Sequence, residues 1–104
     1  PKQKVENRDI KFGDAVFHSG RGELFINDSL VRLTDIEIAL LKVLADRPGD
    51  ILSREELIEL TGTTGGGRAV DVQVTRLRRK IEPDPKLPRY LQTVRGRGYL
   101  LRPD

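Results

Sequence analysis

The sequence predicts an α+β fold in which a meander of short strands precedes three helices and a terminal β-hairpin. Two changes of pattern indicate this order. Apolar residues first occur in short pieces between turn-forming residues, and from about position 34 they recur at the 3.6-residue spacing of helices. After two prolines, two more apolar pieces flank a basic turn. A chain of 104 residues can bury one compact core.

The apolar pieces before position 34 are typical of a small antiparallel meander. Gly13-Asp14, Gly20-Arg21-Gly22 and Asn27-Asp28 divide them, and these residue types favour turns. The meander offers one apolar face, which we expect to serve as a platform for helices. The polar residues 1–9 show no apolar periodicity and are expected to form a linker or disordered terminus, which leaves residues 10–102 as the folded domain.

Two capping boxes predict where the first and second helices begin. Thr34 with Glu37, and Ser53 with Glu56, have the spacing at which each side chain can bond the other residue's backbone N–H. Each box is followed by apolar residues at helical spacing. The first helix is expected to end at residues 47–49, and the second at Thr61-Gly62, with Leu57, Ile58 and Leu60 as the apolar side of the second.

The third helix, expected near residues 68–82, has one apolar side and one cationic side. At about 100° per residue, four aliphatic residues fall within about 60° of one another and form a core stripe. They are Val70, Val74, Leu77 and Ile81. The opposite side carries Arg68, Val72, Thr75 and Arg79, with Arg76 beside them.

Pro83 and Pro85 end this helix, and a hairpin with a cationic tip is expected to follow. Its strands are predicted at residues 90–93 and 98–101, on either side of the turn at residues 94–97. The whole order is that of a helix-turn-helix domain with a hairpin wing.

Basic residues concentrate in the C-terminal third of the chain. The formal net charge is only +3, but residues 68–102 hold ten Lys or Arg and three Asp or Glu, a net +7. Residues 1–67 carry a net −3. A basic region beside an acidic body is typical of proteins that bind polyanions. A solvated surface without a partner explains the charge equally well.

A helix with a cationic outer side and a thin hairpin together fit double-stranded DNA. The helix can enter the major groove, while the hairpin lies along the backbone or the minor groove. Val72 can meet a thymine methyl there, although an exposed valine without a role is an equal alternative. Asp71 would be repelled by DNA, so we expect it to form a salt bridge with an arginine of the same chain.

The sequence offers little for catalysis, and we predict no enzyme, no cofactor and no metal. Without cysteine there is no disulfide, thiolate ligand or cysteine nucleophile. His18 is the only histidine, so no second histidine is available as a metal ligand. The glycines before Arg68 precede a helix but lack the Lys-Ser/Thr of a phosphate-binding P-loop.

Neither a membrane span nor a signal peptide is apparent, so a cytoplasmic protein is expected. Methionine is also absent. Because translation begins with methionine, a chain that starts at Pro1 is expected to be a piece of a longer protein.

Four motifs resemble those of the OmpR/PhoB-type response regulators, in the winged-helix effector domain that forms their C-terminal part. Residues 33–41 and 52–57 resemble the first two helices of that domain. Residues 68–80 look like its recognition helix, and residues 88–99 look like its wing. The resemblance runs from Ile10 to Leu101 in the same order.

The resemblance implies a role in DNA binding for eleven residues. Positions that match base contacts are Val72, Thr75 and Arg76. Those that match backbone contacts are Arg68, Gln73, Arg78, Arg79, Thr93 and Tyr99. Arg95 matches a wing arginine that enters the minor groove, and Arg97 adds a charge where the family varies. For any single arginine here, a surface salt bridge is the alternative.

The resemblance further implies a bacterial two-component transcription regulator. Its receiver domain, absent here, would be phosphorylated on an aspartate and form a homodimer, whereas the isolated effector domain would be monomeric and bind DNA weakly. In this family the loop before the recognition helix can approach RNA polymerase. Here that loop, residues 61–67, is rich in glycine, and we favour a flexible connector. A module that binds proteins through the same helix is the main competing interpretation.

Overall fold

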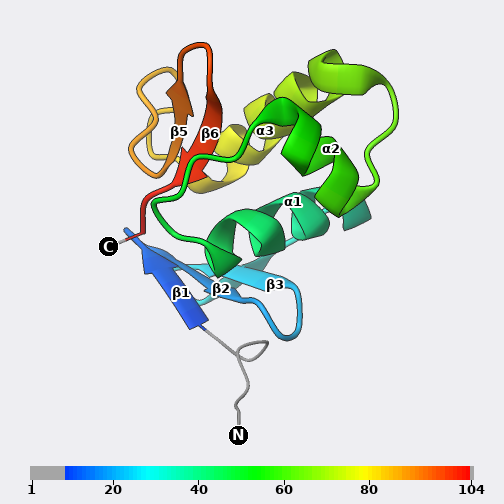
Figure 1. Ribbon diagram of the computed structural model, residues 1–104. Helices are drawn as coiled ribbons and strands as arrows, with labels where there is room; N and C mark the ends of the chain where they lie inside the picture. The colour runs from blue at the N-terminus through cyan, green and yellow to red at the C-terminus, as the bar shows by residue number, and fades with distance from the viewer. Residues whose placement is uncertain (1–8, 104) are drawn as a thin grey trace, which may run out of the picture.

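The computed structural model describes residues 9–103, and these confirm the predicted α+β order of a winged helix (Figure 1). An antiparallel sheet comes first, with its strands in sequence order. Three helices and a separate two-stranded hairpin, the wing, follow. The elements are β1 (Asp9–Phe12), β2 (Ala15–His18), β3 (Glu23–Ile26), β4 (Ser29–Val31), α1 (Asp35–Asp46), α2 (Arg54–Thr61), α3 (Gly66–Ile81), β5 (Leu91–Val94) and β6 (Gly98–Leu101).

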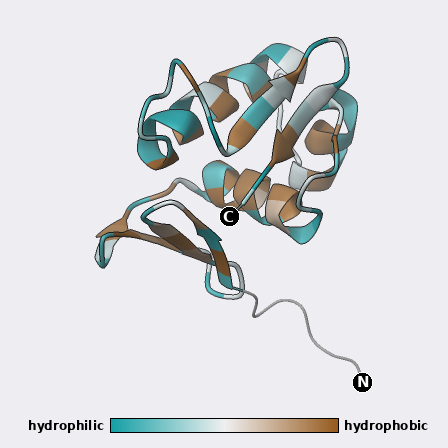
Figure 2. Cartoon of the chain, turned by 90° about the vertical axis from the view of Figure 1, so that its left-hand side faces the viewer, coloured by the Kyte–Doolittle hydropathy of each residue, from teal (hydrophilic) through white to brown (hydrophobic). Residues whose placement is uncertain are grey.

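One face of the sheet is apolar and is covered by α1. Ile10, Phe17, Leu24 and Val31 lie directly opposite one another across the four strands. Figures 1 and 2 show α1 between the sheet and the remaining elements, with hydrophobic residues on both sides of this junction. The predicted platform is therefore confirmed. Strand β1 begins at Asp9, one residue before the expected start, and the rest of the expected linker lies outside the described residues.

Both predicted capping boxes are present. The Glu37 carboxylate accepts the backbone N–H of Thr34, and the Thr34 hydroxyl accepts that of Glu37. Ser53 and Glu56 make the same pair at the start of α2. These contacts satisfy N–H groups that the first turn of a helix otherwise leaves without a partner.

Leu60 departs from the prediction, because it is 48% exposed while Leu57 is fully buried. Leu57, Ile58 and Thr61 are the buried or partly buried residues of this part of α2. At about 100° per residue, Leu60 projects on the far side of Leu57 from the other two. The apolar side of α2 is therefore narrower than its composition suggests.

Helix α3 begins at Gly66, two residues earlier than expected, and ends at Ile81. The helix therefore starts inside the glycine run. Gly67 packs closely against α2, where a β-carbon would lie 2.9 Å from Cδ of Arg54. The predicted stripe is confirmed, since Val70, Val74, Leu77 and Ile81 are all at most 5% exposed.

Backbone hydrogen bonds attach the wing to the loop between α1 and α2. Leu52 and Tyr99 exchange both N–H···O bonds, at 2.8 and 2.9 Å, and the N–H of Gly49 donates to Leu101. Gly98 lies where β6 approaches the loop that contains Leu52, and it has a φ of +148°. A β-carbon at this position would overlap the carbonyl group of Leu52.

A buried carboxylate fixes the entry to the wing. Glu82, which is 6% exposed, follows directly after α3. Its two oxygens accept the backbone N–H groups of Arg89, Tyr90 and Leu91 at 2.7–3.0 Å. The segment between α3 and β5 is therefore closed into a loop at its base.

We predict that Gly98→Ala destabilises the fold by more than about 3 kcal/mol, because the new β-carbon must displace the Leu52 backbone. Gly96→Ala is the matched control, since Gly96 also has a positive φ but no atom within 4 Å of its would-be β-carbon. It should cost only about 1–2 kcal/mol. Urea unfolding measures both, and equal losses would contradict the predicted overlap.

We predict a pH-dependent loss of stability for Glu37→Gln. The Glu37 side chain is 2% exposed and accepts a 2.6 Å hydrogen bond from Nζ of Lys80. Burial raises the pKa of Glu37, but its bonds to Lys80 and Thr34 outweigh burial and hold the pKa below 4.5. The charged carboxylate therefore stabilises the fold above about pH 4.5, and this contribution is lost as the pH falls through the folded-state pKa.

At pH 7 the substitution should cost about 1.5–3 kcal/mol, as for other hydrogen bonds to charged groups. The difference from the unmodified chain should shrink as unfolding is measured at pH values progressively below 4.5, because the Glu37 carboxylate is protonated as the pH falls through its lowered folded-state pKa. Glu55→Gln, at an exposed position of α2, is the control. A difference that does not change with pH would contradict this account.

Candidate nucleic-acid interface

The side of α3 that faces away from the core carries the five residues predicted for it. All five are exposed, and Val72 is 42% exposed. Together with Asp71 they line a shallow depression of about 380 Å³. The five are Arg68, Val72, Thr75, Arg76 and Arg79. Three guanidinium groups thus surround a small polar and a small apolar side chain on one surface.

The hydroxyl of Thr75 already uses its hydrogen within the helix. It donates to the backbone carbonyl of Asp71 at 2.9 Å. The oxygen can therefore still accept a hydrogen bond from outside, while its proton is engaged. A partner group that donates, or a methyl group, suits this position better than an acceptor.

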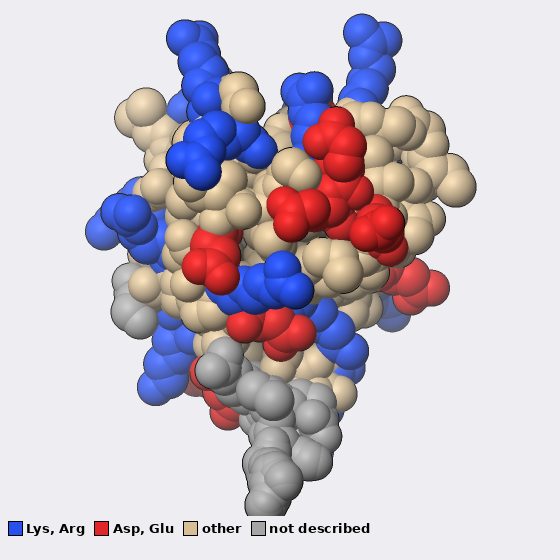
Figure 3. Space-filling view, in the orientation of Figure 1, with Lys and Arg blue, Asp and Glu red and all other residues tan. Residues whose placement is uncertain are grey.

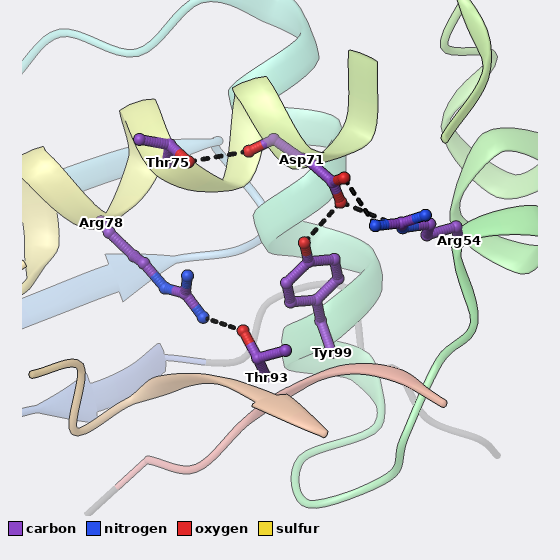
Figure 4. A network of polar contacts seen from close by, with 6 residues as sticks. All are labelled: Arg54, Asp71, Thr75, Arg78, Thr93 and Tyr99. Atoms are coloured by element: carbon purple, nitrogen blue, oxygen red, sulfur yellow. Dashed lines mark hydrogen bonds and ion pairs between the residues drawn. The ribbon is translucent and has the colours of Figure 1, made fainter. Parts of the chain in front are cut away.

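Asp71 forms the intramolecular salt bridge that the sequence predicts. Its two oxygens accept Nε and Nη2 of Arg54 at 3.1 and 2.7 Å, and the phenol of Tyr99 donates to Oδ1 at 2.5 Å. Figure 4 shows these groups converging from α2, α3 and the wing. The sequence did not identify Arg54 as the partner, because 17 residues separate it from Asp71.

Arg78 points from α3 to the wing. Its Nε donates to the carbonyl of Leu91 at 2.9 Å and its Nη2 to the hydroxyl of Thr93 at 2.7 Å. The guanidinium carbon also lies 5.7 Å from the centre of the Tyr99 ring, within range of a cation–π contact. Burial lowers the pKa of Arg78, and the neighbouring Tyr99 and Glu82 act in the opposite direction.

Tyr99 is only 7% exposed, so it presents little surface to a partner. Burial, followed by its bond to Asp71, raises the pKa of its phenol. The hydroxyl is therefore protonated and acts as a donor at neutral pH. Of the predicted backbone contacts, Arg78 and Tyr99 both have protein partners, whereas Arg68 and Arg79 are exposed and Gln73 is partly buried.

The tip of the wing carries two exposed arginines. Arg95 and Arg97 flank Gly96, whose φ of +74° allows the tight turn between β5 and β6. Thr93, which is also exposed, lies on β5 two residues before Arg95. Between the wing and α2 runs a groove of about 280 Å³ whose lining includes Arg54, Thr93 and Arg97.

Charge is unevenly distributed over the surface. Figure 3 shows acidic side chains gathered near the middle of the face on which α2 lies, with basic side chains projecting beyond them at the top of the view. The exposed acidic residues of α2 are Glu55, Glu56 and Glu59. An anionic partner is therefore attracted to the wing and the outer side of α3, and is repelled by α2.

Catalytic and metal-binding features are scarce in the part of the chain that the structure describes. Residues 9–103 contain no group of three or more His, Asp or Glu residues that could hold a metal ion. His18 lies on the sheet, where its Nδ1 is 2.8 Å from Asp9. None of the described helices is long and apolar enough to span a membrane.

Comparison with known proteins places these features in a family. Residues 28–101 match the family described as transcriptional regulatory protein, C terminal. Protein PetR of Rhodobacter capsulatus is 52% identical over 103 aligned residues, a match that covers 91% of this chain and 44% of PetR. The probable transcriptional regulator ycf27 of Porphyra purpurea is 36% identical, and the match covers 89% of this chain and 40% of ycf27. The chain thus spans less than half of either relative.

Solved structures share the fold. The response regulator DrrB of Thermotoga maritima, an OmpR/PhoB homologue, superimposes with a TM-score of 0.82 at 32% identity, over 90% of this chain and 44% of DrrB. The DNA-binding domain of RstA from Klebsiella pneumoniae, solved in complex with the RstA box, gives 0.78 at 31% identity, over 91% and 97% of the two chains. The C-terminal effector domain of BfmR from Acinetobacter baumannii gives 0.77 at 39% identity, over 97% and 94%.

The match over residues 28–101, together with the fold shared with these effector domains, shows that the chain belongs to the OmpR/PhoB family of response-regulator DNA-binding domains.

Proposed function

We propose that this chain binds double-stranded DNA in a sequence-specific manner, with α3 in the major groove and the wing at the adjoining backbone and minor groove. The observation that carries the proposal is the cationic outer side of α3 next to a wing whose tip holds Arg95 and Arg97. A major groove about 12 Å wide accepts a helix, and arginine can bind guanine edges or phosphates there. That RstA was solved with its DNA box supports the same role here.

Three residues near the centre of the outer side of α3 are proposed to contact bases. Arg76 can donate two hydrogen bonds to the acceptors of guanine. The Thr75 oxygen can accept from an exocyclic amino group, because its own proton is donated to Asp71. Val72, exposed between donors, fits a thymine methyl.

The remaining contacts are proposed to be with the sugar-phosphate backbone and the minor groove. Arg68, Gln73 and Arg79 on α3, and Thr93 on the wing, would contact phosphates, and Arg95 and Arg97 would enter or border the minor groove. A narrow minor groove has an enhanced negative potential, which favours a guanidinium there. Arg78 and Tyr99 are proposed to support the wing from behind, since Nε and Nη2 of Arg78 and the hydroxyl of Tyr99 already bond within the protein.

In the whole protein, we propose that this domain is the output half of a two-component transcription regulator. The curated relatives are more than twice as long as the match, which leaves room for a receiver domain. Dimerisation through that receiver would place two domains on half-sites about one helical turn apart. The isolated domain would then bind weakly, because it lacks the gain in effective concentration.

For the segment between α2 and α3 we propose the role of a connector and not of an RNA polymerase contact. Thr61 donates to the carbonyl of Leu57 and pairs with the hydroxyl of Thr63, so both side chains contribute to ending α2. Gly62 and Gly65 contribute no side chain. The segment therefore presents few groups that a protein partner could recognise.

A protein-binding module is the alternative function, and salt dependence separates the two. Log affinity for B-DNA falls by about 0.9 per log unit of salt for each phosphate that is neutralised. An apolar protein interface shows much less dependence. Binding to a duplex selected from random-sequence DNA, measured by fluorescence anisotropy at several salt concentrations, tests the proposal. The absence of salt-sensitive binding, even for an enforced dimer, would overturn it.

We predict different effects for Arg76→Ala and Arg79→Ala, two exposed arginines of the same helix. Arg76→Ala should lower affinity for the selected duplex by about 1–3 kcal/mol and relax base preference. Arg79→Ala should weaken binding to selected and random duplexes about equally, because a phosphate contact carries no sequence information. Gel-shift titrations on both duplexes measure this. Identical losses on the two duplexes for Arg76→Ala would exclude base recognition by that residue.

We also predict that Arg97→Ala makes DNA binding less sensitive to salt. The slope of log affinity against log salt should become less steep by about 0.9 if Arg97 neutralises one phosphate. Arg21→Ala, at a residue with an 81% exposed side chain between β2 and β3, is the control and should leave the slope unchanged. If Arg21→Ala changes the slope as much as Arg97→Ala does, the proposal that DNA binds at the wing is contradicted.

A further inference from the structure

We propose that Asp71 is a positioning residue that sets the orientation of the wing relative to the recognition helix, acting through the Tyr99 hydroxyl. This role for Asp71 rests on the proposed function in DNA binding. Asp71 lies on the DNA-facing helix but carries the wrong charge for DNA. The structure gives its carboxylate a different task.

The carboxylate of Asp71 is the point at which three elements meet (Figure 4). Arg54 reaches it from α2 with two hydrogen bonds, and Tyr99 reaches it from β6 with one. Charge-assisted hydrogen bonds of this kind are stronger than neutral ones, and a two-pronged Arg–carboxylate pair also fixes direction. The Asp71 carboxylate therefore links α3 to both α2 and the wing.

The backbone contacts of the wing leave this orientation incompletely determined. The bridge between Leu52 and Tyr99 ties β6 to the loop before α2, and not to α3. Among the described residues, two side chains of α3 make polar contacts with the strands of the wing: Arg78 bonds to β5, and Asp71 bonds to β6. Together they hold both strands of the wing at a fixed distance from the helix.

The position of the wing matters because Arg95 must reach a narrow groove while α3 occupies the neighbouring one. A side chain that is held in place before binding loses less conformational entropy on binding. Loosening the wing should therefore weaken the contribution of Arg95 in particular. The contribution of Arg76, which belongs to α3 itself, should not change.

Tyr99→Phe tests this inference with the smallest possible change, the removal of one hydroxyl. The penalty of a substitution is here the factor by which it lowers affinity for DNA. The penalties of Arg95→Ala and Arg76→Ala are measured both in the unmodified chain and in Tyr99→Phe. The probe is a duplex selected from random-sequence DNA by the unmodified chain. A general loss of folded protein would affect both penalties equally. A change in the ratio of the two penalties therefore indicates a change in the orientation of the wing and not in stability.

In the unmodified chain, we expect Arg95→Ala to lower affinity roughly 5- to 100-fold. In Tyr99→Phe this penalty should fall to about a third or less, while the Arg76→Ala penalty stays within about twofold, as expected for a distant site. Asp71→Ala, which removes the links to both α2 and the wing, should reduce the Arg95 penalty at least as much. If Asp71→Ala does not fold, Tyr99→Phe still decides.

Tyr90→Phe is the matched control, because it makes the same chemical change next to β5. The Tyr90 hydroxyl lies against Gly13, in the turn between β1 and β2, and away from α3. It should leave both penalties unchanged. The inference is overturned if the Arg95 penalty is the same in Tyr99→Phe as in the unmodified chain, or if it is below twofold in the unmodified chain. Failure of the unmodified chain to bind any duplex would instead overturn the proposed function itself.

Discussion

The burial of one aliphatic side of α3 determines what the opposite side can do. Val70, Val74, Leu77 and Ile81 are in the core, so the helix cannot rotate without exposing them to water. The arginines on the opposite side cannot turn inward either, because an unpaired buried charge is strongly unfavourable. Core packing therefore fixes a cationic surface in one direction before any partner is present.

The wing is held to this helix by contacts of two kinds. Backbone bonds between Leu52 and Tyr99, and the close approach at Gly98, attach it firmly to the loop between α1 and α2. Side-chain bonds from Asp71 and Arg78 then connect it to α3. The first kind attaches β6 to that loop, and we propose that the second sets the position of the wing tip relative to α3. Residues that the family resemblance associates with DNA thus also serve the architecture.

Much of the fold is predictable from the sequence because its signals are local. A capping box such as Thr34 with Glu37 involves residues three positions apart, and the stripe on α3 is a matter of spacing alone. The direction of the α3 surface follows from the same pattern. The exposed residues of the candidate site, such as Arg76 and Arg95, were accordingly assigned to the correct elements and sides.

The contacts that the sequence did not reveal connect distant parts of the chain. Arg54 with Asp71, Glu82 with the residues that enter the wing, and Leu52 with Tyr99 depend on how the elements pack. No periodicity encodes such pairs. The close approach of Gly67 to the Arg54 side chain, in the first turn of α3, likewise depends on how α3 packs against α2.

Chemical-shift mapping tests the central claim most directly. The isotope-labelled chain is titrated with a duplex that it selects from random-sequence DNA, and its backbone amide signals are followed. We predict that the amides of α3 near Val72 and Arg76, and those of the wing tip at residues 95–97, shift most, while β1 to β4 stay unchanged. Shifts centred on the sheet or on the acidic side of α2 would contradict the claim that the cationic helix and the wing form the DNA-binding surface.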